Sequence, residues 1–159
     1  MLPHVGVPVV VAAGPGVASL AQNVLDTEVV ALPSDVPTEP TVTIGPWHHA
    51  PSGKTLRRRT QALLDVIGDH DCSTAVVDLS AEVTVLARLA GLRTVALRQS
   101  GRRTDVAHRV ALDSADIVWV PQDRQLEPLD GPIDERWFFS GPFSRLDATC
   151  RRRRSQSNG

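Results

Sequence analysis

Two polar clusters in the middle of the chain contain residue types that could bind a ligand or move a proton. Each cluster lies at the end of an apolar run that is expected to form a buried strand, at residues 74–79 and 93–97. The clusters consist of Asp78, Ser80 and Glu82, and of Gln99, Gly101, Arg102, Arg103, Asp105 and His108. Because parallel strands end at one edge of a sheet, where such folds bind ligands, we expect both clusters to line one site.

The first cluster has a structural and a functional interpretation. Ser80 is a good helix N-cap, and Glu82 then lies in the first turn, where a carboxylate complements the helix dipole. Alternatively, the free amides of this helix start, together with Ser80, bind a hydroxyl or phosphate group. Asp78 would then orient that group or hold the loop. The motif alone does not separate these interpretations.

The second cluster contains an acid–histidine pair at helical spacing. His108 follows Asp105 by three residues, so on a helix over residues 104–112 the carboxylate can orient the imidazole for proton transfer. Arg102 and Arg103 can bind a phosphate or a carboxylate, and Gly101 permits a sharp turn before the helix. The alternative is a capped helix whose charged residues form surface ion pairs.

The rest of the chain predicts the framework that positions these clusters. Strands are expected at residues 7–12, 28–32, 74–79, 93–97 and 116–120, with a short one at 136–140. Helices are expected at residues 17–25, 56–67, 80–89 and 104–112, with Gly91 as a C-cap and a long loop at residues 34–54. This alternation predicts an α/β fold with a Rossmann-like, doubly wound parallel sheet. We expect one domain over residues 1–147 and a disordered polar tail over residues 148–159.

Three further motifs have simpler interpretations. Gly14–Pro15–Gly16 predicts a tight turn, because it lacks the G-x-G-x-x-G pattern and Pro15 has no amide to offer a phosphate. The Trp47–His49 segment has no nearby carboxylate or cysteine, so we expect no metal site there. Cys72 and Cys150 are expected to be free thiols.

Composition narrows the classes of partner. A net charge of −1 over 159 residues argues against a nucleic-acid partner, and the basic runs at residues 57–59 and 151–154 lack interleaved aromatics. The apolar runs are too short to span a bilayer and residues 1–6 lack the basic start of a signal peptide, so we expect a cytoplasmic protein. An apolar patch near Val83, Leu86 or the Trp47 loop could bring it to a membrane-borne ligand.

Four segments carry a resemblance to a known family. They are VVDLSAEVTVLARLAG (76–91), TVALRQSGRRTDVAH (94–108), ADIVWVP (115–121) and SGPFSRLD (140–147). Over residues 7–147 the chain resembles the N-terminal, acceptor-side domain of GT-B glycosyltransferases. It is similar to the actinobacterial branch around the N-acetylglucosaminyl transferase of peptidoglycan lipid synthesis.

The resemblance implies a role for each polar cluster. In this family the N-terminal domain binds a sugar or lipid-linked acceptor, a second domain binds the nucleotide sugar, and transfer occurs between them. His108 would be the catalytic base, with Asp105 as its partner. The acceptor-binding residues would be Asp78, Ser80, Glu82, Gln99, Gly101, Arg102 and Arg103. The resemblance implies neither a metal nor a resident cofactor, because the nucleotide sugar is a co-substrate.

The chain also departs from the family pattern. It starts at what corresponds to the family's second strand, and it ends where the linker to the donor-binding domain would begin. We therefore expect a domain truncated at both ends, inactive alone, that transfers a hexose only with a separate donor-binding chain. The alternatives are a non-catalytic binding module that pairs through an open sheet edge, or a gene remnant. A nucleotide-binding oxidoreductase domain is disfavoured by the absent G-x-G-x-x-G motif.

Overall fold

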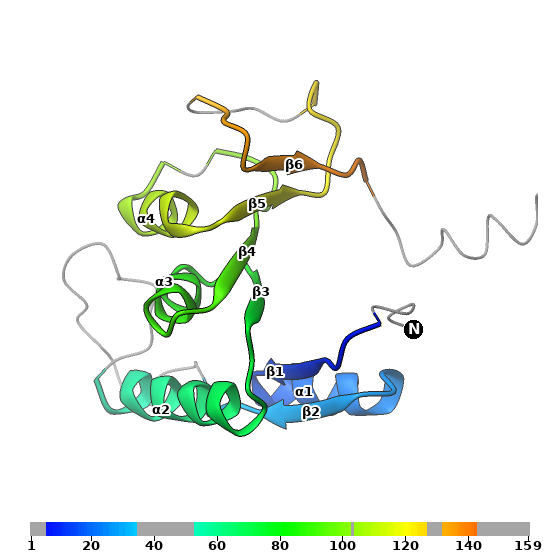
Figure 1. Ribbon diagram of the computed structural model, residues 1–159, viewed down its shortest axis with the longest axis vertical. Coiled ribbons are helices and arrows are strands. Elements are labelled where there is room, and N and C mark those ends of the chain that lie inside the picture. The colour runs from blue at the N-terminus through cyan, green and yellow to red at the C-terminus, as the bar shows by residue number, and fades with distance from the viewer. Residues whose placement is uncertain (1–5, 35–52, 103, 127–131, 143–159) are drawn as a thin grey trace, which may run out of the picture.

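The computed structural model describes residues 6–34, 53–102, 104–126 and 132–142. It is an α/β protein in which parallel strands carry helices, as the sequence predicts (Figure 1). The strands are β1 (Val10–Ala13), β2 (Glu28–Ala31), β3 (Thr74–Asp78), β4 (Arg93–Leu97), β5 (Ile117–Val120) and β6 (Trp137–Phe139). The helices are α1 (Pro15–Val24), α2 (Gly53–Asp69), α3 (Ala81–Leu89) and α4 (Val106–Ser114).

The strands form two hydrogen-bonded sheets. One sheet has the order β3-β4-β5-β6 and the other pairs β1 with β2, and every strand pair is parallel. Figure 1 places β1 between β2 and β3, which is the order of a doubly wound sheet, with α1 on the opposite side of the strands from α2, α3 and α4. Among the described residues, however, no backbone hydrogen bond joins β1 to β3.

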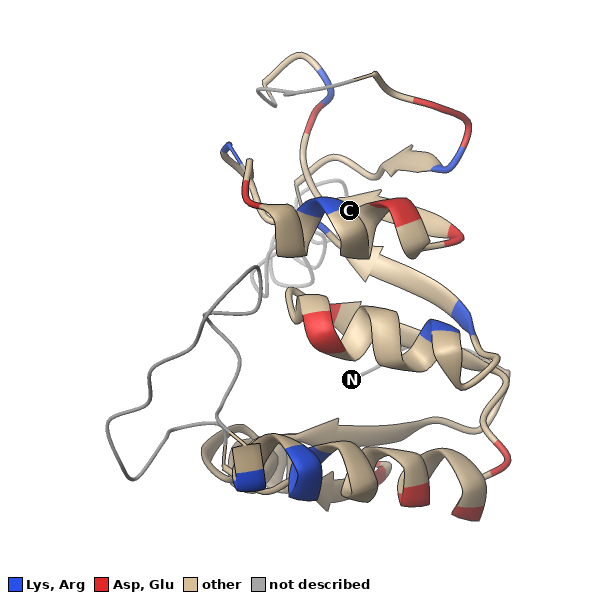
Figure 2. Ribbon diagram, turned by 90° about the vertical axis from the view of Figure 1, so that its left-hand side faces the viewer, with Lys and Arg blue, Asp and Glu red and all other residues tan. Residues whose placement is uncertain are grey.

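The main core lies between the four-stranded sheet and its helices. Val118 and Val120 of β5 are fully buried, and Ala96 of β4 packs against them. Small side chains let α3 and α4 approach each other closely, because Ala81 of α3 packs against Ala107 and Ala111 of α4. Figure 2 faces this helix layer, over which acidic and basic residues are interspersed. The close approach of α3 and α4 brings the starts of both helices to one edge of the sheet.

The opposite face of the four-stranded sheet is also apolar. Val76, Ile117 and Phe138 are 66%, 38% and 57% exposed there. Val76 pairs with Val95, which pairs with Ile117, so these residues form a row across β3, β4 and β5. Strands that are apolar on both faces are typical of a parallel sheet covered on both sides. In the described part of the chain, α1 is the helix on that side, and it packs on β1 and β2.

Most expected elements are confirmed, with shifted ends. The first strand starts at Val10 instead of residue 7, beyond Pro8, which has no N–H for a ladder. The helix expected at residues 56–67 is longer, Gly53–Asp69, and the one expected at 104–112 starts two residues later, at Val106. Gly91 has a φ of 87° just after α3, as a C-terminal cap requires. The predictions for the Trp47–His49 segment and the tail at 148–159 concern residues outside the described ranges.

Candidate functional site

The connection from β3 to α3 is a strained three-residue turn. Leu79 has a φ of 65°, and the Ser80 N–H donates to the Asp78 carbonyl oxygen at 2.9 Å, which makes a γ-turn. A bulky residue in this region of backbone space costs free energy and persists only where the surrounding structure imposes it. The turn leaves the side chain of Asp78 exposed and starts α3 directly after Ser80.

The structural interpretation of Ser80 is half confirmed. Ser80 occupies the N-cap position of α3 and Glu82 lies in the first turn, as the sequence predicts. The Ser80 side chain, however, makes no capping hydrogen bond. Its carbonyl oxygen instead accepts hydrogen bonds from the backbone N–H and the hydroxyl of Thr84, both at 3.0 Å. Ser80 is therefore the N-cap of α3 through its extended backbone, as predicted, but its hydroxyl does not cap the helix.

Asp105 and His108 form the pair that the sequence predicts. Asp105 caps α4, because its carboxylate accepts a hydrogen bond from the His108 N–H at 3.0 Å. Both carboxylate oxygens also lie 2.8 Å from Nδ1 of the His108 ring. The cap fixes the carboxylate, and the carboxylate fixes the ring, which leaves Nε2 as the nitrogen available to another molecule.

The environment of Asp105 favours its ionised form. Burial raises the pKa of the Asp105 carboxyl, but the hydrogen bonds from the His108 backbone and ring and the charge of that ring outweigh this effect. The pKa of Asp105 therefore lies below its ordinary value. An ionised Asp105 is a strong acceptor for a hydrogen bond from Nδ1 of His108, so it holds the orientation of the ring.

The buried side chain of Arg98 holds the loop between β4 and α4 through hydrogen bonds to the loop backbone. This role of Arg98 was not predicted from the sequence. Arg98 is only 5% exposed, and one guanidinium nitrogen donates to the Gly101 carbonyl oxygen at 2.9 Å. Gly101 has a φ of 102°, a conformation that favours glycine. Gln99 and Arg102 are exposed on this loop, and Arg103 lies outside the described residues. The available signal was a charged residue directly after a buried strand.

The turn that carries the first cluster meets the second cluster at the carboxyl edge of the sheet, but through Leu79 and not through its polar residues. Leu79 from the first turn, Gln99 from the second loop and His108 from α4 line one cavity of about 20 Å³. This cavity is too small for a ligand, but it shows that the turn after β3 touches the loop after β4 and the start of α4. None of Asp78, Ser80 and Glu82 lines it, so the expectation that both clusters line one site stays a prediction.

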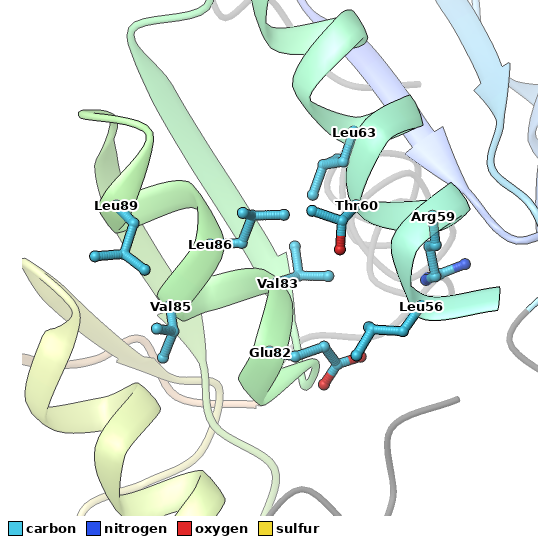
Figure 3. A pocket seen from close by; sticks show the side chains of 9 residues that line it. All are labelled: Leu56, Arg59, Thr60, Leu63, Glu82, Val83, Val85, Leu86 and Leu89. Carbon is cyan, nitrogen blue, oxygen red and sulfur yellow. The ribbon is translucent and has the colours of Figure 1, made fainter. Parts of the chain in front are cut away.

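A larger apolar groove runs between α2 and α3. It has a volume of about 250 Å³, and Figure 3 shows Val83 and Leu86 of α3 facing Thr60 and Leu63 of α2. Leu56, Arg59 and Glu82 lie together at one end of the groove (Figure 3). Because Glu82 is in the first turn of α3, that end of the groove adjoins the turn after β3. Val83 and Leu86 form the apolar patch that the sequence predicts, but the opposite wall from α2 is not apparent from the sequence.

Other features of the described residues bear on possible ligands. In the ranges that the structure covers, no group of three or more His, Cys, Asp or Glu residues could hold a metal ion. Within the same ranges, no helix combines the length and the apolarity needed to cross a membrane. Cys72 is a free thiol, and Cys150 is outside the described ranges.

The fold and the site define a Rossmann-like α/β domain with a polar edge and an adjoining apolar groove. No protein-family model matches the chain, and comparison with curated proteins and with solved structures also gives no match. The geometry of the site and the resemblance in the sequence are therefore the basis on which a function can be proposed.

Proposed function

We propose that this chain is the acceptor-binding domain of a two-part glycosyltransferase. The observation that carries the proposal is the junction of the apolar groove with the polar edge at the start of α3, close to His108. This arrangement suits a lipid-linked acceptor, whose apolar chain would lie between α2 and α3. Its polar head would lie at the ends of β3 and β4, where the exposed guanidinium of Arg102 offers a positive charge to an anionic group.

The proposed reaction uses residues of both clusters. His108 takes the proton of the acceptor hydroxyl at Nε2, while Asp105 stabilises the imidazolium that forms. The acceptor oxygen then bonds to the anomeric carbon of a nucleotide sugar, and the bond from that carbon to the nucleoside diphosphate breaks. The nucleoside diphosphate leaves with the electron pair of that bond. The nucleotide sugar would be held by a separate donor-binding chain.

A binding experiment on the chain alone tests this proposal. The probe is a farnesyl-diphosphate-linked N-acetylhexosamine, which joins an apolar chain, a diphosphate and a sugar hydroxyl in one molecule. We expect calorimetry to detect its binding, and we expect Arg102→Ala to weaken that binding by about tenfold through loss of a charged contact to phosphate. Arg93→Ala is the matched control, because Arg93 lies at the start of β4, at the other edge of the sheet.

Two outcomes would contradict the proposal. One is no detectable binding of the probe, and the other is an equal loss of affinity in Arg102→Ala and Arg93→Ala. A probe that lacks the farnesyl chain separates the groove from the polar edge. We expect it to bind more weakly than the complete probe. Without the farnesyl chain, the apolar side chains of Val83, Leu86 and Leu63 that line the groove stay exposed to water.

A second candidate function is a non-catalytic interaction module. The exposed row of Val76 and Ile117, with Phe138 beside it, favours this alternative, because apolar sheet faces mark sites of association. A molar mass that rises with concentration in light scattering, together with no binding of the probe, would support the module instead of the transferase domain.

A further inference from the structure

Among the residues that the structure describes, Arg98 is the one charged residue whose side chain is buried. It directly follows β4 and is 5% exposed, and its backbone N–H donates to the Trp119 carbonyl oxygen of β5 at 2.8 Å. The backbone of Arg98 is therefore still part of the sheet, although its side chain carries a charge. A guanidinium is costly to bury unless its donors are used, so its contacts must offset this cost.

The contacts of the Arg98 guanidinium join the loop to the edge strand β6 of the same sheet. One nitrogen donates to the Gly101 carbonyl oxygen at 2.9 Å, and another lies 3.4 Å from the Gln99 carbonyl oxygen, at the long end of hydrogen bonding. The central carbon of the guanidinium lies 5.9 Å from the ring centroid of Trp137 on β6, within the range of a cation–π contact. A planar group with several fixed donors can make all these contacts at once.

We propose that Arg98 is a positioning residue of the candidate acceptor site, an inference that rests on the proposed function. Its guanidinium fixes the carbonyl groups of Gln99 and Gly101, and this sets the path of the loop at residues 99–102. That loop presents the exposed side chains of Gln99 and Arg102 and leads into the Asp105 cap of α4. Arg98 acts through the loop and does not touch the ligand.

Hydrogen exchange of the full chain tests the positioning role without a ligand. Arg98→Met keeps the length and the apolar stem beside Trp137 but removes every donor. We expect the amides of residues 99–102 to exchange about tenfold faster in Arg98→Met, with little change in β5. Thr94→Val is the matched control, since Thr94 is also fully buried on β4 but bonds to Asp116 at the opposite end of the strand.

The Arg98→Lys variant separates charge from geometry. A lysine keeps the positive charge but lacks the planar set of donors that binds two carbonyl groups at once. We therefore expect the amides of the loop in Arg98→Lys to exchange at rates between those of the parent chain and those of Arg98→Met. If Arg98→Met does not fold, the comparison of Arg98→Lys with the parent chain decides the same question. Loop exchange that matches the parent chain in the folded variants, or that rises equally in the loop and in β5, would overturn the proposal.

Affinity for the farnesyl-diphosphate probe distinguishes this inference from the proposed function. If both are correct, Arg98→Lys weakens probe binding severalfold while its melting temperature stays close to that of Thr94→Val. If the loop exchanges faster but the parent chain does not bind the probe, Arg98 positions the loop and the proposed acceptor is wrong. If the parent chain binds the probe and Arg98→Lys binds it equally well, the positioning role is overturned.

Discussion

At the scale of single residues, the candidate site depends on side chains whose positions are fixed by their own backbone. Asp105 caps α4 and also contacts the His108 ring, so one carboxylate starts the helix and orients the imidazole. Leu79 takes a positive φ that brings Ser80 to the start of α3. Strain and capping of this kind act locally, and together they fix the positions of the polar side chains at the carboxyl edge of the sheet.

The charge on Asp105 should contribute to stability in a pH-dependent way. Because the pKa of Asp105 is lowered in the folded state, its contribution is present above the pKa of the unfolded chain and is lost as pH falls through the folded value. Asp105→Asn keeps a good cap and removes the charge. We expect its melting temperature to be lower than that of the parent chain at about pH 6 and the difference to shrink below about pH 4.

The control for Asp105→Asn is Asp26→Asn, an exposed carboxylate between α1 and β2. This variant should melt with the parent chain at each pH. If the melting temperatures of Asp105→Asn and the parent chain differ by the same amount at both pH values, the role of the Asp105 charge is contradicted.

His108 should affect turnover more than affinity. With a donor-binding chain supplied, we expect His108→Ala to lower kcat about a hundredfold or more, the typical contribution of a general base, and to leave acceptor affinity nearly unchanged. His70→Ala is the control, because His70 lies beyond the end of α2, 3.6 Å from Glu28. Unchanged turnover in His108→Ala would remove this residue from the mechanism.

At the scale of elements, the helices and strands position the site through packing that differs between the two sheet faces. On β5, Val118 faces the helix layer and is fully buried, whereas Val76 of β3 faces the other way and is 66% exposed. The apolar groove arises because α2 and α3 leave space between their side chains. Residues on the helix-covered face of the sheet should therefore contribute more to the free energy of unfolding than residues on the opposite, exposed face.

Two matched valine substitutions test this difference. Val118→Ala should lower the free energy of unfolding by about 2 kcal/mol, since it removes two buried methyl groups and leaves a cavity. Val76→Ala should change the free energy of unfolding by less than about 0.5 kcal/mol. Urea unfolding measures both values. A large loss in Val76→Ala would mean that this sheet face is covered in solution.

At the scale of the whole molecule, the division into two sheets is the main feature. β1 and β2 pair with each other, and all four residues of β1 are only half-buried although they are valine and alanine. The sheet of β3 to β6 contains the fully buried residues Val118, Val120 and Thr94. The two parts should therefore open with different free energies.

Hydrogen exchange can resolve these free energies. We expect the amides of β2 to exchange faster than those of β4 and β5, because opening the β1–β2 pair breaks no hydrogen bond to β3 among the described residues. Native-state exchange with mass spectrometry measures this order. Equal protection in both sheets would mean that they form one cooperative unit in solution.

The local parts of this protein follow from its sequence. The apolar runs of β-branched residues predict the strands, the 3.6-residue spacing predicts the helices, and their alternation predicts the parallel α/β fold. The Asp105–His108 contact was predictable too, because it joins residues one helical turn apart. These features depend on neighbours within a few residues, which is the range over which sequence patterns act.

Only the tertiary structure decided which distant residues meet. It leaves β1 beside β3 without a backbone hydrogen bond between them in the described ranges (Figure 1). It places α2 opposite α3 to form the groove and brings Leu79 beside Gln99 and His108. It also buries Arg98 under the loop that follows it, a position that its charge argued against. Such contacts depend on how elements far apart in the chain pack together, and no local spacing of residue types encodes that packing.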